Sequence, residues 1–426
     1  MNGAAPMSDL ARRAGTRVLV HHPGSNHLAY EVVAGLQASG FACDFDTGFF
    51  YAPDGRVARL ADALPERWRG RVLRELKRRS HAGVDPARVR LFASPELAYV
   101  ALNRLGLAPS PLARVIGWRD ELFDRWVAGH VLRGRPRIVV GHDSSSLLSF
   151  RAAREVGAVS VLNQVTGHIE AGLQIFRDEL AHAPEFAESL TVPPASIIER
   201  CRREALEADH VLVPSDYVRR TLVERGTAPE RIAVLPYGVD VERFRPQPRR
   251  DRAIFRMLFV GNISQRKGIK YLLEALRRLK LPHAELVLVG RIVGSSSALA
   301  PYADLFRHVP HVPYHEVHRL YADADLFVYP SLHEGSAFAT YEALASGLPV
   351  IATPNTGSVV RDGVDGYLVP VRDVDAVMAK IELLYRDGER RAAMGAAARQ
   401  RALEFTWRAY RERLAALFDG FVSASS

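Results

Sequence analysis

The stretch that decides the fold is residues 329–351, which read YPSLHEGSAFATYEALASGLPVI. The apolar residues that lead into it predict a short strand, and a turn that holds Glu334 follows. Small and apolar residues then predict a helix over 337–346, which contains Glu342, and a second strand follows at 349–353. A strand, a loop, a helix and a strand in this order predict a parallel sheet covered by helices.

The start of this helix suits a phosphate, because a helix N-terminus presents unpaired backbone N–H groups and the positive end of the dipole. Glu334 in the loop could accept hydrogen bonds from sugar hydroxyls. Glu342 lies eight residues later, about two helical turns along and on nearly the same face, and could grip a ribose. The alternative is an ordinary loop acid and a solvated helix acid, but the apolar residues 343–345 disfavour free solvation of Glu342.

A second polar loop follows a predicted strand at 255–260, where residues 259–269 read FVGNISQRKGI. It contains Gly261 and two adjacent cations, Arg266 and Lys267. A diphosphate leaving group needs fixed positive charge, which this pair could supply without a metal. The alternative is a solvated surface loop, but a position after the first strand of a sheet domain favours binding.

Two loops of the N-terminal half are weaker candidates. Residues 163–170, NQVTGHIE, follow a predicted strand, and His168 within them could face a cleft and contact a sugar. The alternative is a histidine that is hydrogen-bonded within the fold. Gly24 lies in the first loop between a strand and a helix, where a glycine could let a phosphate approach closely.

The rhythm of strand, loop and helix occurs twice along the chain. A proline-rich, charged segment at 244–251 separates the two occurrences, so we expect two α/β sheet domains in tandem with a cleft between them. The region 44–135 matches no clear pattern. The apolar face of 407–418 predicts a final helix that can pack on either domain.

Composition excludes several classes. With 48% hydrophobic and 25% charged residues among 426, the chain has the make-up of a globular protein and not of a disordered one. Only two cysteines are present, which excludes a disulfide scaffold and predicts a cytoplasmic protein. The net charge of +9 favours an anionic ligand or membrane surface, and we expect no nucleic-acid partner.

Other chemistries lack their sequence patterns. The chain has no GxSxG, HExxH or GxxxxGK[ST] motif, and no GxGxxG follows the first strand. Four histidines between 308 and 318 have the spacing of metal ligands but are expected at the surface, so no metal site is predicted.

Taken together, these motifs resemble those of retaining glycosyltransferases of the GT4 type, which have the GT-B fold. The E-x7-E run from Glu334 to Glu342 is similar to the donor-site signature of that family. The loop with Arg266 and Lys267 is similar to the family's diphosphate-binding loop. Further similar segments are 213–215, 236–244, 363–369 and 405–407. The resemblance is strong from about 205 to 415.

The resemblance implies two Rossmann-like α/β domains that face a central cleft. The first would be an acceptor-side domain of residues 1–250, to which a C-terminal helix within 404–426 crosses back. The second, 251–403, would bind the donor. That donor would be a nucleotide-diphosphate sugar, UDP- or GDP-linked, and the acceptor a glycan, a lipid-linked or a small molecule. Retention of configuration without a metal or cofactor is implied as well.

The resemblance also implies roles for individual residues. Glu334 would contact the donor sugar, Glu342 would hold the ribose, and Arg266 and Lys267 would stabilise the diphosphate. The histidine matched by approximate context is His168. The residues that would bind the donor through their backbone are Gly261, Ser336, Ala337, Phe338 and the loop of Gly24.

The chain departs from the family after its first glutamate. The common form there is Gly-Phe-Gly, whereas this chain has Gly335-Ser336-Ala337. We expect the Cβ of Ala337 to narrow the space through which a phosphate or sugar approaches the backbone. This departure leaves the identity of the donor open but does not affect the predicted fold.

Residues 67–79, RWRGRVLRELKRR, suggest how an acceptor could be reached. Trp68, Val72, Leu73 and Leu76 share one helical face, and seven basic residues surround it. This pattern is typical of a peripheral membrane helix, here at the inner face of the membrane. The alternative is an amphipathic helix that packs on its own domain.

Rival functions share the fold. A sugar-nucleotide epimerase would act without an acceptor, and a phosphorylase would need inorganic phosphate. A protein of another class would bind a nucleotide sugar or glycan without catalysis. The intact pairs Glu334/Glu342 and Arg266/Lys267 argue against the last alternative.

Overall fold

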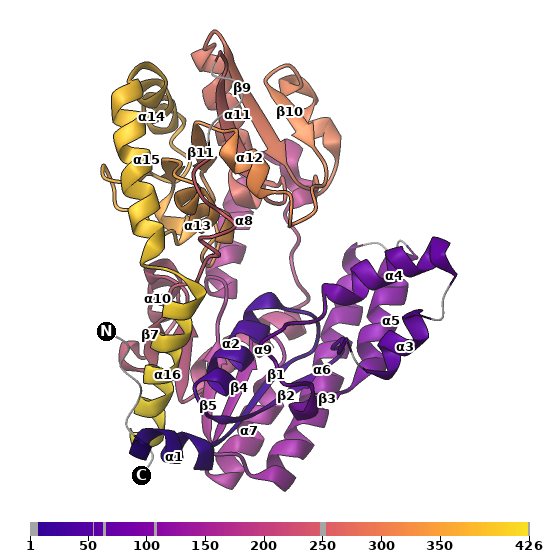
Figure 1. Ribbon diagram of the computed structural model, residues 1–426. Coiled ribbons are helices and arrows are strands. Elements are labelled where there is room, and N and C mark those ends of the chain that lie inside the picture. The colour runs from indigo at the N-terminus through magenta and orange to yellow at the C-terminus, as the bar shows by residue number, and fades with distance from the viewer. Residues whose placement is uncertain (1–6, 54, 63–64, 106–108, 248–252, 425–426) are drawn as a thin grey trace.

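The computed structural model describes residues 7–53, 55–62, 65–105, 109–247 and 253–424. The chain forms two halves, and each is built on a parallel sheet between helices (Figure 1). The first sheet has the strand order β3-β2-β1-β4-β5-β6-β7. Its strands are β1 Arg17–His22, β2 Ala42–Thr47, β3 Val89–Leu91, β4 Ile138–His142, β5 Val159–Asn163, β6 His210–Val213 and β7 Ile232–Val234.

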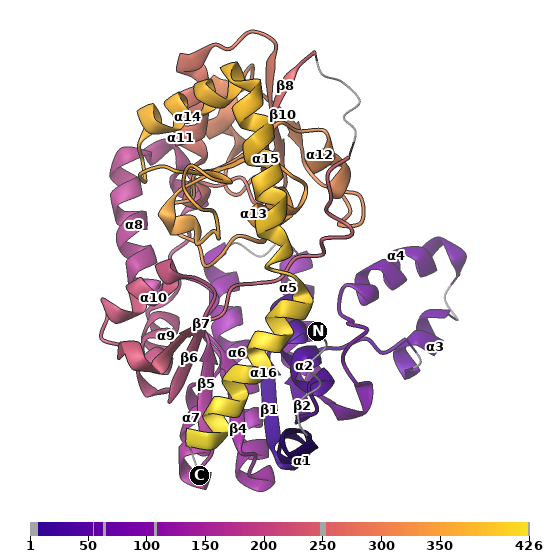
Figure 2. The same ribbon diagram turned by 60° about the vertical axis from the view of Figure 1, so that its left-hand side comes forward.

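The helices of the first half cover both faces of this sheet, except that α3 and α4 extend sideways from the body (Figures 1 and 2). They are α1 Met7–Gly15, α2 His27–Ala38, α3 Arg56–Asp62, α4 Glu66–Lys77, α5 Ala93–Arg104, α6 Pro109–Gly134, α7 Leu147–Val156, α8 Ile169–His182, α9 Ala195–Glu207 and α10 Asp216–Val223.

The second sheet has the strand order β10-β9-β8-β11-β12-β13. Its strands are β8 Phe255–Val260, β9 Ala284–Val289, β10 Phe306–Val309, β11 Leu326–Tyr329, β12 Val350–Ala352 and β13 Gly366–Leu368. Its helices are α11 Ile269–Leu279, α12 His318–Ala322, α13 Phe338–Ala345, α14 Val374–Arg386 and α15 Gly388–Leu403. The strand order reverses between β8 and β11, and ligands of such sheets bind outside the carboxyl ends of the strands at this point.

The loops after β8 and β11 are the two that the sequence singled out, so the topology brings them together. Strand β11 is buried along its whole length, as a parallel strand with helices on both faces must be. The prediction of two Rossmann-like sheets with the GT-B arrangement is confirmed.

The last helix, α16 Trp407–Ala424, returns to the first half and runs beside α2 (Figure 2). Leu414 and Phe418 are fully buried, and Phe418 meets the ring of Phe41 edge-on. Arg411 forms an ion pair of 2.7 Å with the buried Glu31 of α2. The C-terminal helix therefore packs on the first half through both apolar contacts and an ion pair.

Strand β3 and most of β2 lie in the region 44–135, which matched no clear pattern, and β10 was also not predicted. Strand β2 reads ACDFDT, and its acidic residues obscure the pattern of a buried strand. Asp46 is fully buried because Arg90 and His130 bind its two carboxylate oxygens at 2.6 and 2.7 Å.

None of the helices within the described residues combines the length and the apolar character that crossing a membrane requires.

Candidate active site

A cleft of about 830 Å³ lies between the two halves. The first half contributes residues such as Asn26, Thr166 and Tyr237, and the second half contributes the ends of β8, β9 and β11 and the start of α13. The predicted site residues that line it are Gly261, Lys267, Glu334, Ser336, Ala337, Phe338 and Glu342.

Glu334 is held between the two predicted cations. Nη1 of Arg266 lies 3.3 Å from Oε1 of Glu334, and Nζ of Lys267 contacts Oε2. Nζ of Lys267 also lies 5.2 Å from the ring centroid of Tyr329, on which it can rest as a cation on a π face. Three charges from two loops therefore meet at one point beside the cleft.

The local sequence explains why Arg266 and Lys267 lie next to the loop that holds Glu334. Residues 265–267 form a single 3-10 turn that ends at Gly268, which has φ +70°. A Cβ at this position would clash with the carbonyl oxygen of Pro330, so only glycine allows the two loops to approach. Burial and Arg266 lower the pKa of the Lys267 ammonium, whereas the adjoining Glu334 carboxylate favours its charged form.

Glu342 is buried, with 9% of its surface exposed, so it is not a solvated helix acid. Tyr321 of α12 donates a hydrogen bond of 2.7 Å to its Oε2. Burial raises the pKa of Glu342 to about 7, although the hydrogen bond from Tyr321 opposes the rise. Tyr321 could not be predicted as the partner of Glu342, because it lies on another helix 21 residues earlier in the chain.

The start of α13 opens on the cleft. Its N-cap residue, Ala337, has φ −74°, a value at which a Cβ causes no backbone strain. The side chain of Ala337 forms no capping hydrogen bond. The Ser336 hydroxyl donates to the Gly357 carbonyl at 2.7 Å and fixes the approach to the helix. The first turn of α13 thus presents uncapped N–H groups to the cleft at Phe338 and Ala339.

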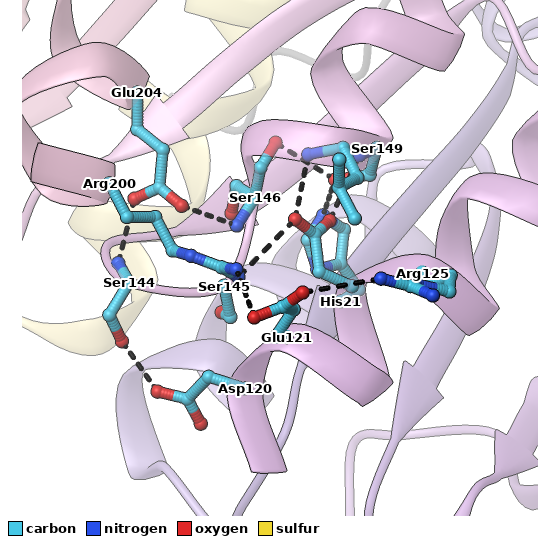
Figure 3. A network of polar contacts seen from close by, with 12 residues as sticks. His21, Asp120, Glu121, Arg125, Ser144, Ser145, Ser146, Ser149, Arg200 and Glu204 are labelled. Atoms are coloured by element: carbon cyan, nitrogen blue, oxygen red, sulfur yellow. Dashed lines mark hydrogen bonds and ion pairs between the residues drawn. The ribbon is translucent and has the colours of Figure 1, made fainter. Parts of the chain in front are cut away.

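The corresponding helix of the first half, α7, has its N-terminus closed by the protein's own carboxylates (Figure 3). Glu204 accepts hydrogen bonds of 2.7 Å from the backbone N–H groups of Ser144 and Ser146. Asp124 accepts those of residues 148 and 149 at 2.7 and 2.9 Å. An anion at the start of α7 would meet the carboxyl groups of Glu204 and Asp124, whereas no side chain caps the start of α13. The second half is therefore the better site for a diphosphate.

Three predicted residues do not line the main cleft. His168 is the N-cap of α8, and its Nδ1 accepts a hydrogen bond of 3.2 Å from the N–H of Glu170, so its contact with a sugar stays a prediction. Gly24 is buried beside the side chains of Glu96 and Arg119, and Asn26 is the residue of that loop which reaches the cleft.

The third, Arg266, lines a smaller cavity of about 220 Å³ that adjoins the cleft at Thr166. His333 lies there as well and was missed by sequence reasoning, although it precedes Glu334. Its Nδ1 is 2.6 Å from the hydroxyl of Tyr217. Burial and the two neighbouring cations lower the pKa of His333 to about 4, so its ring is neutral at physiological pH.

The two halves touch directly beside Glu334. The Ser215 hydroxyl donates to the Gly335 carbonyl at 2.5 Å, and the N–H of Gly167 donates to the Glu334 carbonyl at 3.2 Å. A Cβ on Gly335 would clash with the carbonyl oxygen of Val165. This glycine is therefore needed for the close contact that forms one wall of the site.

The basic segment 67–79 forms α4 and the turn after it. Trp68 is 51% exposed, whereas Val72, Leu73 and Leu76 are partly buried. The apolar face is thus partly covered by the protein, and Trp68 remains open. Within the described residues, no group of three or more histidine, cysteine or acidic side chains is arranged to hold a metal ion.

Two family models match the chain. The model described as Glycosyltransferase Family 4 matches residues 56–243, and the model described as Glycosyl transferases group 1 matches residues 240–401. The two matches overlap at residues 240–243, and together they reach from α3 to α15.

Similar proteins carry related names. Sulfoquinovosyl transferase SQD2 of Arabidopsis thaliana is 30% identical over 54% of this chain, and the match spans only 47% of that relative, about half its length. D-inositol 3-phosphate glycosyltransferase 1 of Catenulispora acidiphila is 29% identical over 70% of this chain and 82% of its own.

Solved structures extend the likeness to the whole fold. The Anabaena protein Alr3699/HepE, crystallised with UDP and glucose, superposes with a TM-score of 0.62 at 14% identity, covering 95% of this chain and 100% of its own. The two family matches and the shared fold show that the chain belongs to the GT4-type glycosyltransferases with the GT-B fold.

Proposed function

We propose that the protein is a retaining, metal-independent glycosyltransferase. It moves a sugar from a UDP- or GDP-linked donor to a hydroxyl of a glycan, a lipid-linked or a small-molecule acceptor. The observation that carries this proposal is the meeting of Arg266, Lys267 and Glu334 beside the open start of α13. Fixed cations and uncapped N–H groups are what a departing diphosphate requires.

The remaining groups of the cleft fit the rest of such a donor. The buried carboxylate of Glu342 accepts hydrogen bonds from the ribose hydroxyls, and that of Glu334 accepts them from the sugar. A cleft of about 830 Å³ has room for a nucleotide sugar. The Anabaena protein of the same fold was crystallised with UDP and with UDP-glucose, which supports a nucleotide sugar as the ligand.

The reaction breaks the bond between the anomeric carbon and the β-phosphate oxygen, and the electron pair stays on that oxygen. Arg266 and Lys267 stabilise the charge that develops there. The acceptor oxygen bonds to the anomeric carbon on the face that the phosphate leaves, and its proton passes to the departing phosphate. The anomeric configuration is thereby retained, and no metal takes part.

Donor cleavage tests this proposal without a known acceptor. The protein is incubated with UDP-glucose or GDP-mannose in phosphate-free buffer, and proton NMR records the first sugar released. We expect slow release of the α anomer, unaffected by EDTA and reduced in Lys267→Ala. Early release of the β anomer would contradict retention. A sugar epimerised at C2 would indicate an epimerase. Binding of the nucleotide sugar without release of any sugar would indicate a catalytically silent protein.

We propose further that α4 lets the protein dock on anionic membranes when its acceptor is lipid-linked. The exposed Trp68 beside basic side chains carries this proposal. Co-sedimentation with vesicles of phosphatidylglycerol tests it, with Trp68→Ala and Arg74→Glu expected to reduce binding. Arg408→Glu, on the distant helix α16, is the control and should bind as the wild type does. Absence of binding by the wild type would refute it.

A further inference from the structure

A buried carboxylate joins the two halves away from the cleft. Glu179, near the end of α8, is fully buried, and its hydrogen-bond donors come from the second half. Nε2 of Gln265 lies 2.6 Å from one carboxylate oxygen, Nε of Arg372 lies 2.6 Å from the other, and the hydroxyl of Tyr271 lies 3.0 Å from both. Figures 1 and 2 show α8 reaching up beside the second half.

Gln265 connects this carboxylate to the site, because it is the residue before Arg266 and Lys267 in the same 3-10 turn. Gln265 is fully buried, and both its backbone N–H and its side-chain amide form hydrogen bonds. Its backbone N–H donates to the hydroxyl of Ser189 in the first half at 3.0 Å, and its Oε1 accepts from the N–H of Lys270 at 3.2 Å. The first half thus holds the turn that carries the two cations.

The contacts around Glu179 are costly to break for a physical reason. A buried carboxylate that loses its donors, or buried donors that lose their acceptor, carry the full cost of desolvation. Arg372 meets Glu179 from a backbone with φ +67°, a conformation that a non-glycine residue keeps only when its surroundings hold it. Contacts from several elements therefore converge on this one carboxylate.

We propose that Glu179 is a positioning residue, which fixes Arg266 and Lys267 through Gln265 so that they meet the donor diphosphate already in place. This role rests on the proposed function, since it assumes that the two cations bind a diphosphate. It makes the binding of the diphosphate depend on contact between the halves. The nucleoside part of the donor binds elsewhere in the cleft and does not depend on that contact.

The test measures how much the diphosphate adds to nucleoside binding. Calorimetry gives Kd for UDP and uridine, and for GDP and guanosine, with the wild type and Glu179→Ala. We expect the ratio of nucleoside Kd to diphosphate Kd to fall about tenfold in the variant, while the nucleoside Kd is unchanged. A purely structural role would lower the melting temperature and leave this ratio as it is.

A matched control lies one residue away. Asp178 is on the same helix and contacts Arg372 at 3.4 Å but does not touch Gln265, so Asp178→Asn should keep the wild-type ratio. Gln265→Ala should lower the ratio as Glu179→Ala does, and it carries the test if Glu179→Ala does not fold. An unchanged ratio in the folded variant would overturn the positioning role alone. A wild type that binds neither UDP nor GDP would overturn the proposed function together with it.

Discussion

The hydroxyl of Tyr321 donates a hydrogen bond of 2.7 Å to Glu342, and so joins α12 to α13 at a carboxylate that lines the cleft. The bond stabilises the ionised carboxylate, but burial outweighs it and raises the pKa of Glu342 to about 7. The charge of the group assigned to the ribose therefore changes within the physiological range.

Binding of the donor should depend on pH through Glu342. Ribose hydroxyls donate to the ionised carboxylate, so the ionised form binds and the protonated form does not. Affinity should therefore rise with pH up to about 7 and fall about tenfold per unit below it. Calorimetry with UDP-glucose or GDP-mannose between pH 5.5 and 8.5 measures this, because a nucleotide sugar has no phosphate that titrates there. Glu342→Gln should give a flat profile.

Replacing Tyr321 should move that profile. Tyr321→Phe removes the hydrogen bond that favours the ionised carboxylate, so the pKa of Glu342 should rise further. A hydrogen bond to a charged group is worth about 1.5–3 kcal/mol, which corresponds to roughly one to two pH units. The same titration should show weaker binding at pH 7 that recovers at higher pH. A profile identical to that of the wild type would contradict the assignment of this pair.

Removal of one cation should affect the chemical step. Lys267→Ala withdraws a fixed charge from the leaving group, and loss of one preorganised donor of this kind lowers kcat by about 10²–10³. The nucleoside Kd should be unchanged, because the base and ribose bind elsewhere. Lys380→Ala is the control, since that lysine lies over Tyr367 and not in the cleft. Equal losses of activity in both variants would refute the role.

The contact between the halves should require Gly335. Gly335→Ala places a Cβ against the Val165 carbonyl, and overpacking of this kind costs about 1–3 kcal/mol. Urea unfolding should show the loss, together with weaker nucleotide binding. Gly420→Ala is a matched control inside α16, where no atom lies within 4 Å of the added Cβ, and it should be neutral or slightly stabilising.

The sequence predicted the second half well, because its strands are apolar and its polar loops follow them directly. Gly261, Lys267 and Glu334 are close together since parallel strands bring their carboxyl ends to one edge. The partner of Glu342 could not be predicted in this way, because Tyr321 comes from another helix and meets it only through tertiary packing.

The first half was harder to predict for two reasons. Strand β2 carries two acidic residues, and one of them, Asp46, is buried only because distant residues such as Arg90 pair with it. His168 has the context of a binding residue but caps a helix, and whether a histidine caps or binds depends on the position of the chain around it. The domain boundaries and the role of each site residue stay predictions.

Nucleotide binding tests the central claim most directly. Thermal unfolding is recorded with UDP, GDP, ADP, TDP and CDP, with and without EDTA, for the wild type, Glu342→Ala and Lys267→Ala. A ligand at about 100 times its Kd adds roughly 2.7 kcal/mol of stability. We predict that one nucleotide stabilises the wild type regardless of EDTA and that both variants respond less. Equal stabilisation of the wild type and both variants, or a response that EDTA abolishes, would contradict the donor site described above.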